Sequence, residues 1–268
     1  IVTAHQSFHG RTMATITATG QPKFHQGFEP MLPGFRYVPY DDLAALDAAI
    51  TPGTGAVLLE TIQGEGGVRT PSEGYWPAVR QLCNDKNVLL ILDEVQTGLC
   101  RTGVLFAHQD YEFAPDSITR AKGLANGVPI GAMGCTEEVA AGFSPGAHAC
   151  TFGGNPLSSA AALATLETLL TPGFIQNAAR LGEYFLARLR QLSEDHDSIV
   201  EVRGKGLMIG VEFKETVPPL IEKMLNSGVI CGPAGPHVLR FLPPLIVSEE
   251  QIERVLSILQ ACLGELGW

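Results

Sequence analysis

Short apolar runs alternate with helical patterns over the first part of the chain. Six of these runs are bounded by turn residues and have the length and composition of strands that are buried on both faces. They are Ile1–Ala4, Phe35–Val38, Ala56–Leu59, Val88–Leu92, Ser117–Thr119 and Ile130–Cys135. Between them, Asp41–Ile50 and Pro77–Lys86 carry apolar residues at helical spacing. Because strand, helix and strand in succession require crossover connections, we predict an α/β fold with a mostly parallel sheet.

The pattern changes after Cys150, where two long helices and a group of short strands are expected. The helices span Pro156–Leu170 and Phe174–Asp195, and Thr171-Pro172-Gly173 separates them. The remaining elements are strands at Ile199–Val202, Met208–Phe213, Val229–Cys231 and Val238–Phe241, and a last helix that begins after a capping box at Ser248. We therefore predict a large domain over residues 1–172 and a smaller α+β domain over residues 173–268.

Composition and charge exclude several classes of protein. With 45% hydrophobic and 17% charged residues, the 268-residue chain can bury a core, so a disordered tail is excluded. The 18 Lys and Arg against 28 Asp and Glu give a net charge of −10, which argues against a nucleic-acid partner. Apolar runs such as Val88–Leu92 are too short to cross a bilayer, and no signal peptide opens the chain. We expect no membrane partner and a cytoplasmic location.

The cysteines and the first residues add two expectations. The six cysteines form no C-x-x-C pair, so neither a metal site nor a disulfide framework is predicted. The chain opens within a predicted strand, at Ile1, and its first methionine is Met13. We therefore expect an N-terminally incomplete chain.

Two acids, Asp93 and Glu94, follow the buried run that ends at Leu92. Ligands of open α/β sheets bind at the carboxyl ends of the strands, so an acid is well placed there for chemistry. Three interpretations stay open at this point: a helix cap, the acid pair of an ATPase, or an acid that binds a protonated cofactor ring. The ATPase interpretation requires a G-x-x-x-x-G-K-[S/T] loop, which this sequence does not contain.

Lys122 differs in its setting from the other five lysines. It follows the short strand Ser117–Thr119 and precedes a glycine-rich stretch that ends at Gly131. Glycines allow the backbone and a ligand to approach closely. A lysine and an aspartate at neighbouring strand ends suggest pyridoxal phosphate, which needs a covalently attached lysine and an acid at its pyridinium nitrogen.

Seven motifs in order along the chain carry a resemblance to a known family. They are Ser7-Phe-His-Gly-Arg-Thr12, Glu60-Thr-Ile-Gln-Gly-Glu-Gly-Gly-Val68, Leu92-Asp-Glu-Val-Gln-Thr-Gly-Leu-Cys-Arg-Thr-Gly103, Ala121-Lys122-Gly123, Thr151-Phe-Gly-Gly-Asn-Pro156, Val202-Arg-Gly-Lys-Gly-Leu-Met208 and Arg240-Phe-Leu-Pro-Pro-Leu245. The chain resembles the class III aminotransferases, and most closely their acetylornithine branch. The resemblance implies the pyridoxal-phosphate-dependent transferase fold type I and a homodimer.

The resemblance also implies a role for each matching residue. Lys122 and Asp93 match the catalytic lysine and the pyridinium partner. The other cofactor-binding matches are Phe8 and Val95 on the two ring faces, Gln96 near the phenolic oxygen, and Thr151, a phosphate ligand donated across the dimer interface. The substrate-binding matches are Arg11 and Arg240 for carboxylates, and Glu65 as the acid that pairs with Arg240.

Other residues are left outside the predicted site. We interpret His5, His9 and His148 as satisfied loop or core histidines. Glu60 and Glu94 are interpreted as acids around the site or local caps. Three residues depart from the family pattern: Cys150 stands where a small hydroxyl residue is more common, Arg120 is a charge beside the lysine, and Asn126 replaces a common glycine. The family's phosphate-cradling loop is expected N-terminal to residue 1.

The expected reaction moves the terminal amino group of N-acetylornithine to 2-oxoglutarate, a step of arginine biosynthesis. The same motifs serve relatives that act on ornithine, succinylornithine, acetyl-lysine-like substrates or 4-aminobutyrate, so these alternatives stay open. Two unrelated alternatives are an ATPase that uses Asp93 and Glu94, and a dimerisation scaffold without activity.

Overall fold

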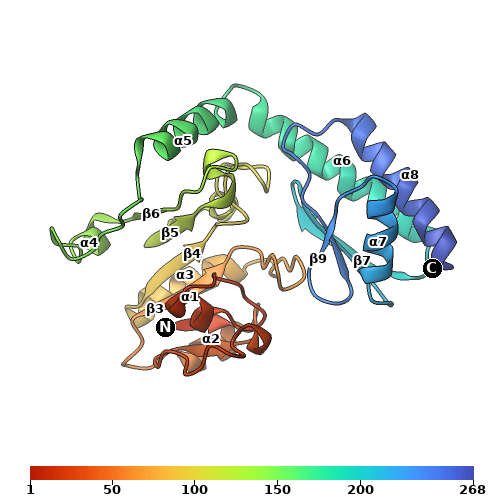
Figure 1. The fold of residues 1–268 in the computed structure, drawn as a ribbon. Coiled ribbons are helices and arrows are strands. Elements are labelled where there is room, and N and C mark those ends of the chain that lie inside the picture. The colour runs from red at the N-terminus through yellow and green to blue at the C-terminus, as the bar shows by residue number, and fades with distance from the viewer. The chain divides into compact units, whose positions relative to one another are not determined.

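The chain forms two compact units in a computed structural model that describes residues 1–268 (Figure 1). Unit 1 consists of Ile1–Thr61, Pro71–Leu99 and Phe106–Pro172. Unit 2 consists of Ile62–Thr70, Cys100–Leu105 and Gly173–Trp268. Two short segments from the first half of the sequence therefore fold together with the C-terminal residues. Among the helices, none has the length and apolar character that a membrane crossing needs.

Unit 1 is built on a six-stranded sheet with the order β2-β1-β3-β4-β5-β6. The strands are β1 (Val2–Ala4), β2 (Arg36–Val38), β3 (Ala56–Glu60), β4 (Leu89–Asp93), β5 (Ser117–Arg120) and β6 (Ala132–Cys135). Neighbours are parallel except β5 and β6, which are antiparallel. Val57, Leu59, Leu90 and Leu92 on the two central strands have no exposed surface. The α/β fold with a mostly parallel sheet is confirmed.

The helices of unit 1 begin at recognisable local signals. They are α1 (Met13–Ala18), α2 (Leu43–Ala49), α3 (Tyr75–Lys86), α4 (Glu137–Ala140) and α5 (Pro156–Leu169), with 3-10 turns η1 (Pro22–Phe24), η2 (Ala107–Tyr111) and η3 (Lys122–Ala125). The Asp42 carboxylate caps α2 by accepting from the Ala45 amide at 2.8 Å. Trp76 and Val79 of α3 are buried in one apolar cluster with the central strands.

Unit 2 contains a separate antiparallel sheet with the order β7-β8-β10-β9. Its elements are α6 (Phe174–Glu194), β7 (Ile199–Lys205), β8 (Met208–Phe213), α7 (Pro218–Asn226), β9 (Gly232–Pro233), β10 (Val238–Phe241) and α8 (Glu249–Leu266). The strand predicted at Val229–Cys231 was wrong. The Val229 amide instead donates to the Met224 carbonyl of α7, and the pairing with β10 begins only at Gly232.

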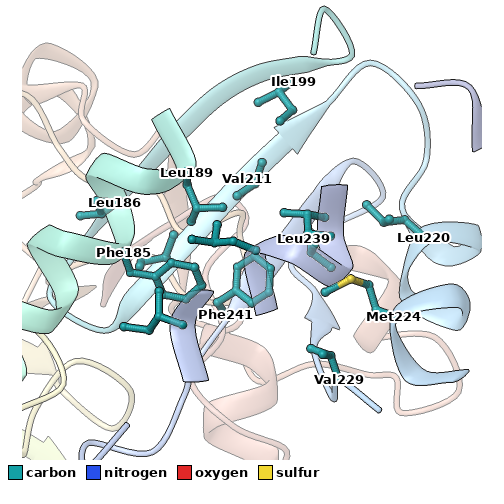
Figure 2. Packing of buried hydrophobic residues seen from close by; sticks show 14 of the residues in the cluster. Phe185, Leu186, Leu189, Ile199, Val211, Leu220, Met224, Val229, Leu239 and Phe241 are labelled. Carbon is teal, nitrogen blue, oxygen red and sulfur yellow. The ribbon is translucent and has the colours of Figure 1, made fainter. Parts of the chain in front are cut away.

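The core of unit 2 lies between its helices and its sheet. Phe185 and Leu189 of α6 face Val211, Leu239 and Phe241 of the sheet (Figure 2). The Phe185 and Phe241 ring centroids are 5.3 Å apart. Because these side chains are nearly or fully buried, they form the face by which α6 packs on the sheet.

The segment Cys100–Leu105 is held in unit 2 by a buried arginine and by glycines. The Arg101 guanidinium donates to the Leu207 carbonyl at 3.0 Å and to the Pro243 carbonyl at 2.6 Å. Burial lowers the pKa of Arg101 to about 10. A Cβ at Gly206 would lie 2.5 Å from the Thr102 carbonyl carbon, so only glycine allows this approach.

Candidate active site

Three strands of unit 1 end side by side and bring polar residues to one edge of the sheet. In the strand register, Glu60 of β3 lies opposite Asp93 of β4, and Asp93 lies opposite Thr119 of β5. This is the carboxyl edge, where ligands of open α/β sheets bind. The strand-end position that the sequence predicted for Asp93 is therefore the observed one.

The Asp93 carboxylate is largely buried and is held from three sides. Its Oδ1 accepts from the Val95 amide at 3.0 Å and from the Thr119 hydroxyl at 3.3 Å. Its Oδ2 lies 2.8 Å from the Nδ1 atom of His9. A carboxylate offers about four acceptor positions, so these partners leave one for a further donor.

His9 takes part in the site, although its sequence setting indicated only a satisfied loop or core histidine. Both ring nitrogens do have partners, since Nε2 lies 3.0 Å from the Thr3 hydroxyl. With the proton on Nδ1, the ring donates to Asp93 and accepts from Thr3. The His9 side chain is 1% exposed, so His9 fixes the orientation of Asp93. Its position within the Ser7–Thr12 motif, next to Phe8, is the signal that could have identified it.

Lys122 opens the η3 turn directly after β5 and Ala121. Its φ of +42° is a left-handed backbone conformation, which non-glycine residues adopt rarely. The Leu124 amide closes the turn on the Ala121 carbonyl at 2.9 Å. Lys122 is exposed to solvent. A strained lysine at a strand end is typical of a functional site.

Arg120, which departs from the family pattern, packs against an aromatic ring. Its guanidinium carbon lies 4.2 Å from the centre of the Phe106 ring. Burial lowers the pKa of Arg120, and the nearby Glu94 charge opposes that effect. The structure thus gives this charge a packing partner in unit 1.

The aromatic residue and the first arginine of the Ser7–Thr12 motif lie together. The Arg11 guanidinium carbon is 5.6 Å from the Phe8 ring centre and 4.6 Å from that of Phe24. The Phe8 amide donates to Glu60 Oε2 at 3.1 Å, so Glu60 anchors the backbone that carries Phe8. Arg11 remains exposed, which leaves its charge available to an anion.

The Glu94 carboxylate binds the η2 turn. The Glu94 carboxylate is buried and accepts from the Ala107 amide, the His108 amide and His108 Nδ1 at 2.7–2.9 Å. It therefore caps the η2 turn. Val95 and Gln96, by contrast, are half-buried beside Asp93 in the chain.

Thr151 lies outside the strand-end group around Asp93. It lies in an exposed loop between α4 and α5, where residues 141–154 are almost entirely accessible. Its predicted role as a phosphate ligand therefore stays a prediction.

In unit 2, the structure pairs Glu65 with Arg240 as the sequence predicted. The Glu65 Oε1 atom lies 2.7 Å from the Arg240 Nη1 atom. The side chains are 32% and 14% exposed, respectively, so the pair is only partly shielded from water. Glu65 lies in the Ile62–Thr70 loop and Arg240 in β10.

The mostly parallel sheet, with Lys122 and Asp93 at its carboxyl edge, is the arrangement of the fold type I transferases. Residues 1–263 match the family model described as "Aminotransferase class-III", and the chain belongs to this family. It is 47% identical over 267 residues to the acetylornithine aminotransferase of Caldanaerobacter subterraneus subsp. tengcongensis, covering 99% of this chain and 68% of that protein. It is 48% identical over 278 residues to that of Thermosynechococcus vestitus, covering 100% of this chain and 67% of the relative.

A solved structure of high similarity is the ornithine aminotransferase from Toxoplasma gondii ME49. It has a TM-score of 0.95 and 36% identity, and the match covers 99% of this chain and 65% of that one. The chain thus spans about two thirds of the length of the relatives it matches. These comparisons confirm the family resemblance and the fold class predicted from the motifs.

Proposed function

We propose that this protein is a pyridoxal-phosphate-dependent aminotransferase that moves the terminal amino group of N-acetylornithine to 2-oxoglutarate, forming a semialdehyde and glutamate. The observation that carries the activity is the buried Asp93 carboxylate at the strand edge, beside the turn that presents Lys122. The substrate follows from curated relatives named acetylornithine aminotransferase at 44–48% identity. Neither an ATPase nor an inactive scaffold requires this arrangement.

The residues present fit the cofactor. The three partners of Asp93 leave one acceptor position for the protonated ring nitrogen, whose positive charge the carboxylate would stabilise. Lys122 would bind the cofactor covalently, Phe8 and Val95 would contact the ring faces, and Gln96 would lie near the phenolic oxygen. When bound, pyridoxal phosphate supplies an electron sink for the substrate carbon that loses its proton.

The chain's own residues then move protons and bind carboxylates. The Lys122 amine would take the proton from the substrate carbon and pass it to C4′ of the cofactor when that is bound. Thr119 and His9 hold the Asp93 charge in a fixed orientation during this exchange. Arg11 binds the distal carboxylate of the substrate.

The Glu65–Arg240 pair would allow two unlike substrates to react. Glutamate has a carboxylate on its reacting carbon, which Arg240 would bind in a bidentate way. Acetylornithine reacts at its far amino group and has no carboxylate there. In that half-reaction Glu65 stays paired with Arg240, which avoids an unpaired charge in a partly desolvated site.

A second candidate is transfer from ornithine, since an ornithine aminotransferase shares 36% identity and a TM-score of 0.95. Single-turnover spectra with N-acetylornithine, ornithine, succinylornithine and 4-aminobutyrate distinguish these donors. We expect kcat/KM for N-acetylornithine to exceed that for ornithine by at least about tenfold, a difference of about 1.4 kcal/mol. A preference for another donor would reassign the substrate, and no spectral change with any donor would reject the activity.

We also propose that a second copy of the chain covers an apolar surface of unit 1. Six large apolar side chains between residues 133 and 170 are more than half exposed, an accumulation typical of interaction surfaces. They are Met133, Phe143, Phe152, Leu157, Leu163 and Leu170. Thr151 lies within this stretch, so the same association would bring it to the partner's cofactor phosphate.

Sedimentation of two matched variants tests the dimer. Phe152 is 82% exposed in this stretch, whereas Ile230 is 89% exposed in unit 2. We expect Phe152→Asp to produce monomers with weakened cofactor binding, and Ile230→Asp to remain dimeric. An unchanged dimer in Phe152→Asp would place the interface elsewhere.

A further inference from the structure

The Ile62–Thr70 loop is closed on itself and seated on the sheet of unit 2. The Gln63 and Arg69 backbones exchange two hydrogen bonds of 3.0 Å, which join the two ends of the loop. Ile62 and Val68 are fully buried in a cluster with Met208, Ala234 and Val238. Glu65, the partner of Arg240, lies between these two anchored ends.

One row of the sheet lies beneath this loop. Arg203 of β7 and Arg240 of β10 are both in register with the same residue of β8, Gly210. Residues in one row across a sheet point to the same face, so the two arginines lie on either side of Gly210. A Cβ on Gly210 would lie 2.9 Å from the Val68 Cβ atom, so the missing side chain makes room for the loop.

Arg203 binds the backbone of the Ile62–Thr70 loop. Its Nε and Nη2 atoms donate to the Gly67 carbonyl at 2.9 and 2.7 Å. Its Nη1 atom donates to the Glu201 and Glu212 carboxylates, each at 2.5 Å. The Arg203 side chain is 9% exposed. The planar fork of the guanidinium thus reaches the carbonyl through two nitrogens and both acids through the third, a geometry that a lysine does not reproduce.

The loop backbone is strained where Arg203 holds it. Val68 has a φ of +50°, which is a genuine outlier for a β-branched residue, and Gly67 has a φ of +113°. Such a conformation persists only where the surrounding structure enforces it. The hydrogen bonds from Arg203 to the Gly67 carbonyl enforce it on one side, and the apolar cluster that contains Val68 enforces it on the other.

We propose that Arg203 is the positioning residue that holds Glu65 over Arg240. By fixing the position of Gly67, Arg203 sets the distance between the loop and the row formed by Arg203, Gly210 and Arg240. That distance determines the strength of the Glu65–Arg240 ion pair. Arg203 acts on substrate carboxylates only through Glu65, because its own nitrogens are occupied by Gly67, Glu201 and Glu212. This inference rests on the proposed role of Arg240 in binding carboxylates.

The test combines amide exchange with binding of glutarate, a dicarboxylate that cannot react. In the cofactor-loaded protein, Arg203→Gln should speed exchange of the Val68 and Arg69 amides at least about tenfold, since local opening then costs less. Arg188→Gln is the matched control, because Arg188 uses the same two nitrogens, Nε and Nη2, to bind Glu253 elsewhere in unit 2. It should leave both amides unchanged.

Glutarate affinity shows whether the hydrogen bonds between Arg203 and the loop act through Glu65. Arg203→Gln and Glu65→Ala should each tighten glutarate binding about fivefold, the range of one partly exposed ion pair. The double variant should be no tighter than Glu65→Ala alone, because both changes remove the same competitor. Arg203→Lys should lie between Arg203→Gln and the unchanged protein.

Several outcomes would overturn the inference. Additive tightening in the double variant would mean that Arg203 does not work through Glu65, and so would faster exchange without any change in glutarate affinity. Failure of the proposed function would give a different result. In that case Arg240→Ala would leave glutarate binding intact, or N-acetylornithine would give no turnover. The amide-exchange result depends neither on glutarate binding nor on turnover.

Discussion

The two units hold their carboxylates in opposite ways. In unit 1, Asp93 is bound by a backbone amide, a hydroxyl and a buried imidazole, all supplied by the sheet edge and its loops. In unit 2, the Glu65 carboxylate is paired with the Arg240 guanidinium and is 32% exposed. Several rigid partners suit an acid whose charge stays constant through a reaction. A partly exposed ion pair suits an acid that must leave when a competing carboxylate arrives.

Unit 1 contains the residue with the largest expected effect. In the proposed mechanism, Lys122→Ala removes the covalent attachment of the cofactor and the proton acceptor together. Because general acid–base catalysis alone contributes about 10²- to 10⁴-fold, we expect transamination to fall at least about 10³-fold. Stopped-flow measurement of both half-reactions checks this, with Lys205→Ala in unit 2 as the control. Normal turnover in Lys122→Ala would reject the assignment.

The constant-charge role of Asp93 predicts the next largest effect. Asp93→Asn keeps the shape of the side chain but removes the charge that favours a protonated ring nitrogen. We expect the cofactor to remain partly bound while proton abstraction slows about 10²-fold, which corresponds to a pKa change of about two. Glu94→Gln is the neighbouring control, and it should mainly lower stability. Full activity of Asp93→Asn with bound cofactor would remove Asp93 from the mechanism.

The exchangeable role of Glu65 predicts effects that differ between the half-reactions. Arg240→Ala should lower kcat/KM for glutamate about 30-fold and affect N-acetylornithine far less, because a charged hydrogen-bonded contact contributes about 2 kcal/mol. Glu65→Ala should shift the ratio towards glutamate. Single-turnover spectra of both substrates measure this, and equal losses in both half-reactions for either variant would contradict the switch.

The smallest effect is expected for His9, which acts through Asp93. His9→Asn shortens the side chain and abolishes the 2.8 Å contact, while the Val95 amide and the Thr119 hydroxyl remain. We expect kcat to fall about fivefold, the value of one hydrogen bond, with little change in KM. His5→Asn in the same segment serves as the control. A loss as large as that of Asp93→Asn would mean that His9 has a direct chemical role.

Local patterns predicted most of the fold. The buried runs around Val57 and Leu90 lie in strands because continuous apolar residues require burial on both faces. The error at Val229–Cys231 arose because the Val229 amide donates to the Met224 carbonyl of α7. The apolar content of the segment does not reveal this hydrogen bond. The short helices α1 and α4, of six and four residues, have too few turns for a periodic signal.

The positions of the candidate site residues were predictable where they follow from local sequence. Asp93 ends a buried strand and Lys122 follows the next strand after one residue, and the ion pair of Glu65 and Arg240 was implied by the family motifs. The contact of His9 with Asp93 spans 84 positions, and that of Arg203 with Gly67 spans 136. Such contacts depend on how distant segments pack, which one sequence does not encode as a local pattern.

The central claim is that Lys122 binds pyridoxal phosphate at the carboxyl edge of unit 1. Borohydride reduction of the cofactor-loaded protein, followed by tryptic peptide mass spectrometry, tests it most directly. Reduction should bleach the visible absorbance band and block cleavage after Lys122, which leaves the added pyridoxyl phosphate mass on the peptide that begins at Ala121. Labelling at another lysine, or bleaching with no labelled peptide, would contradict the account.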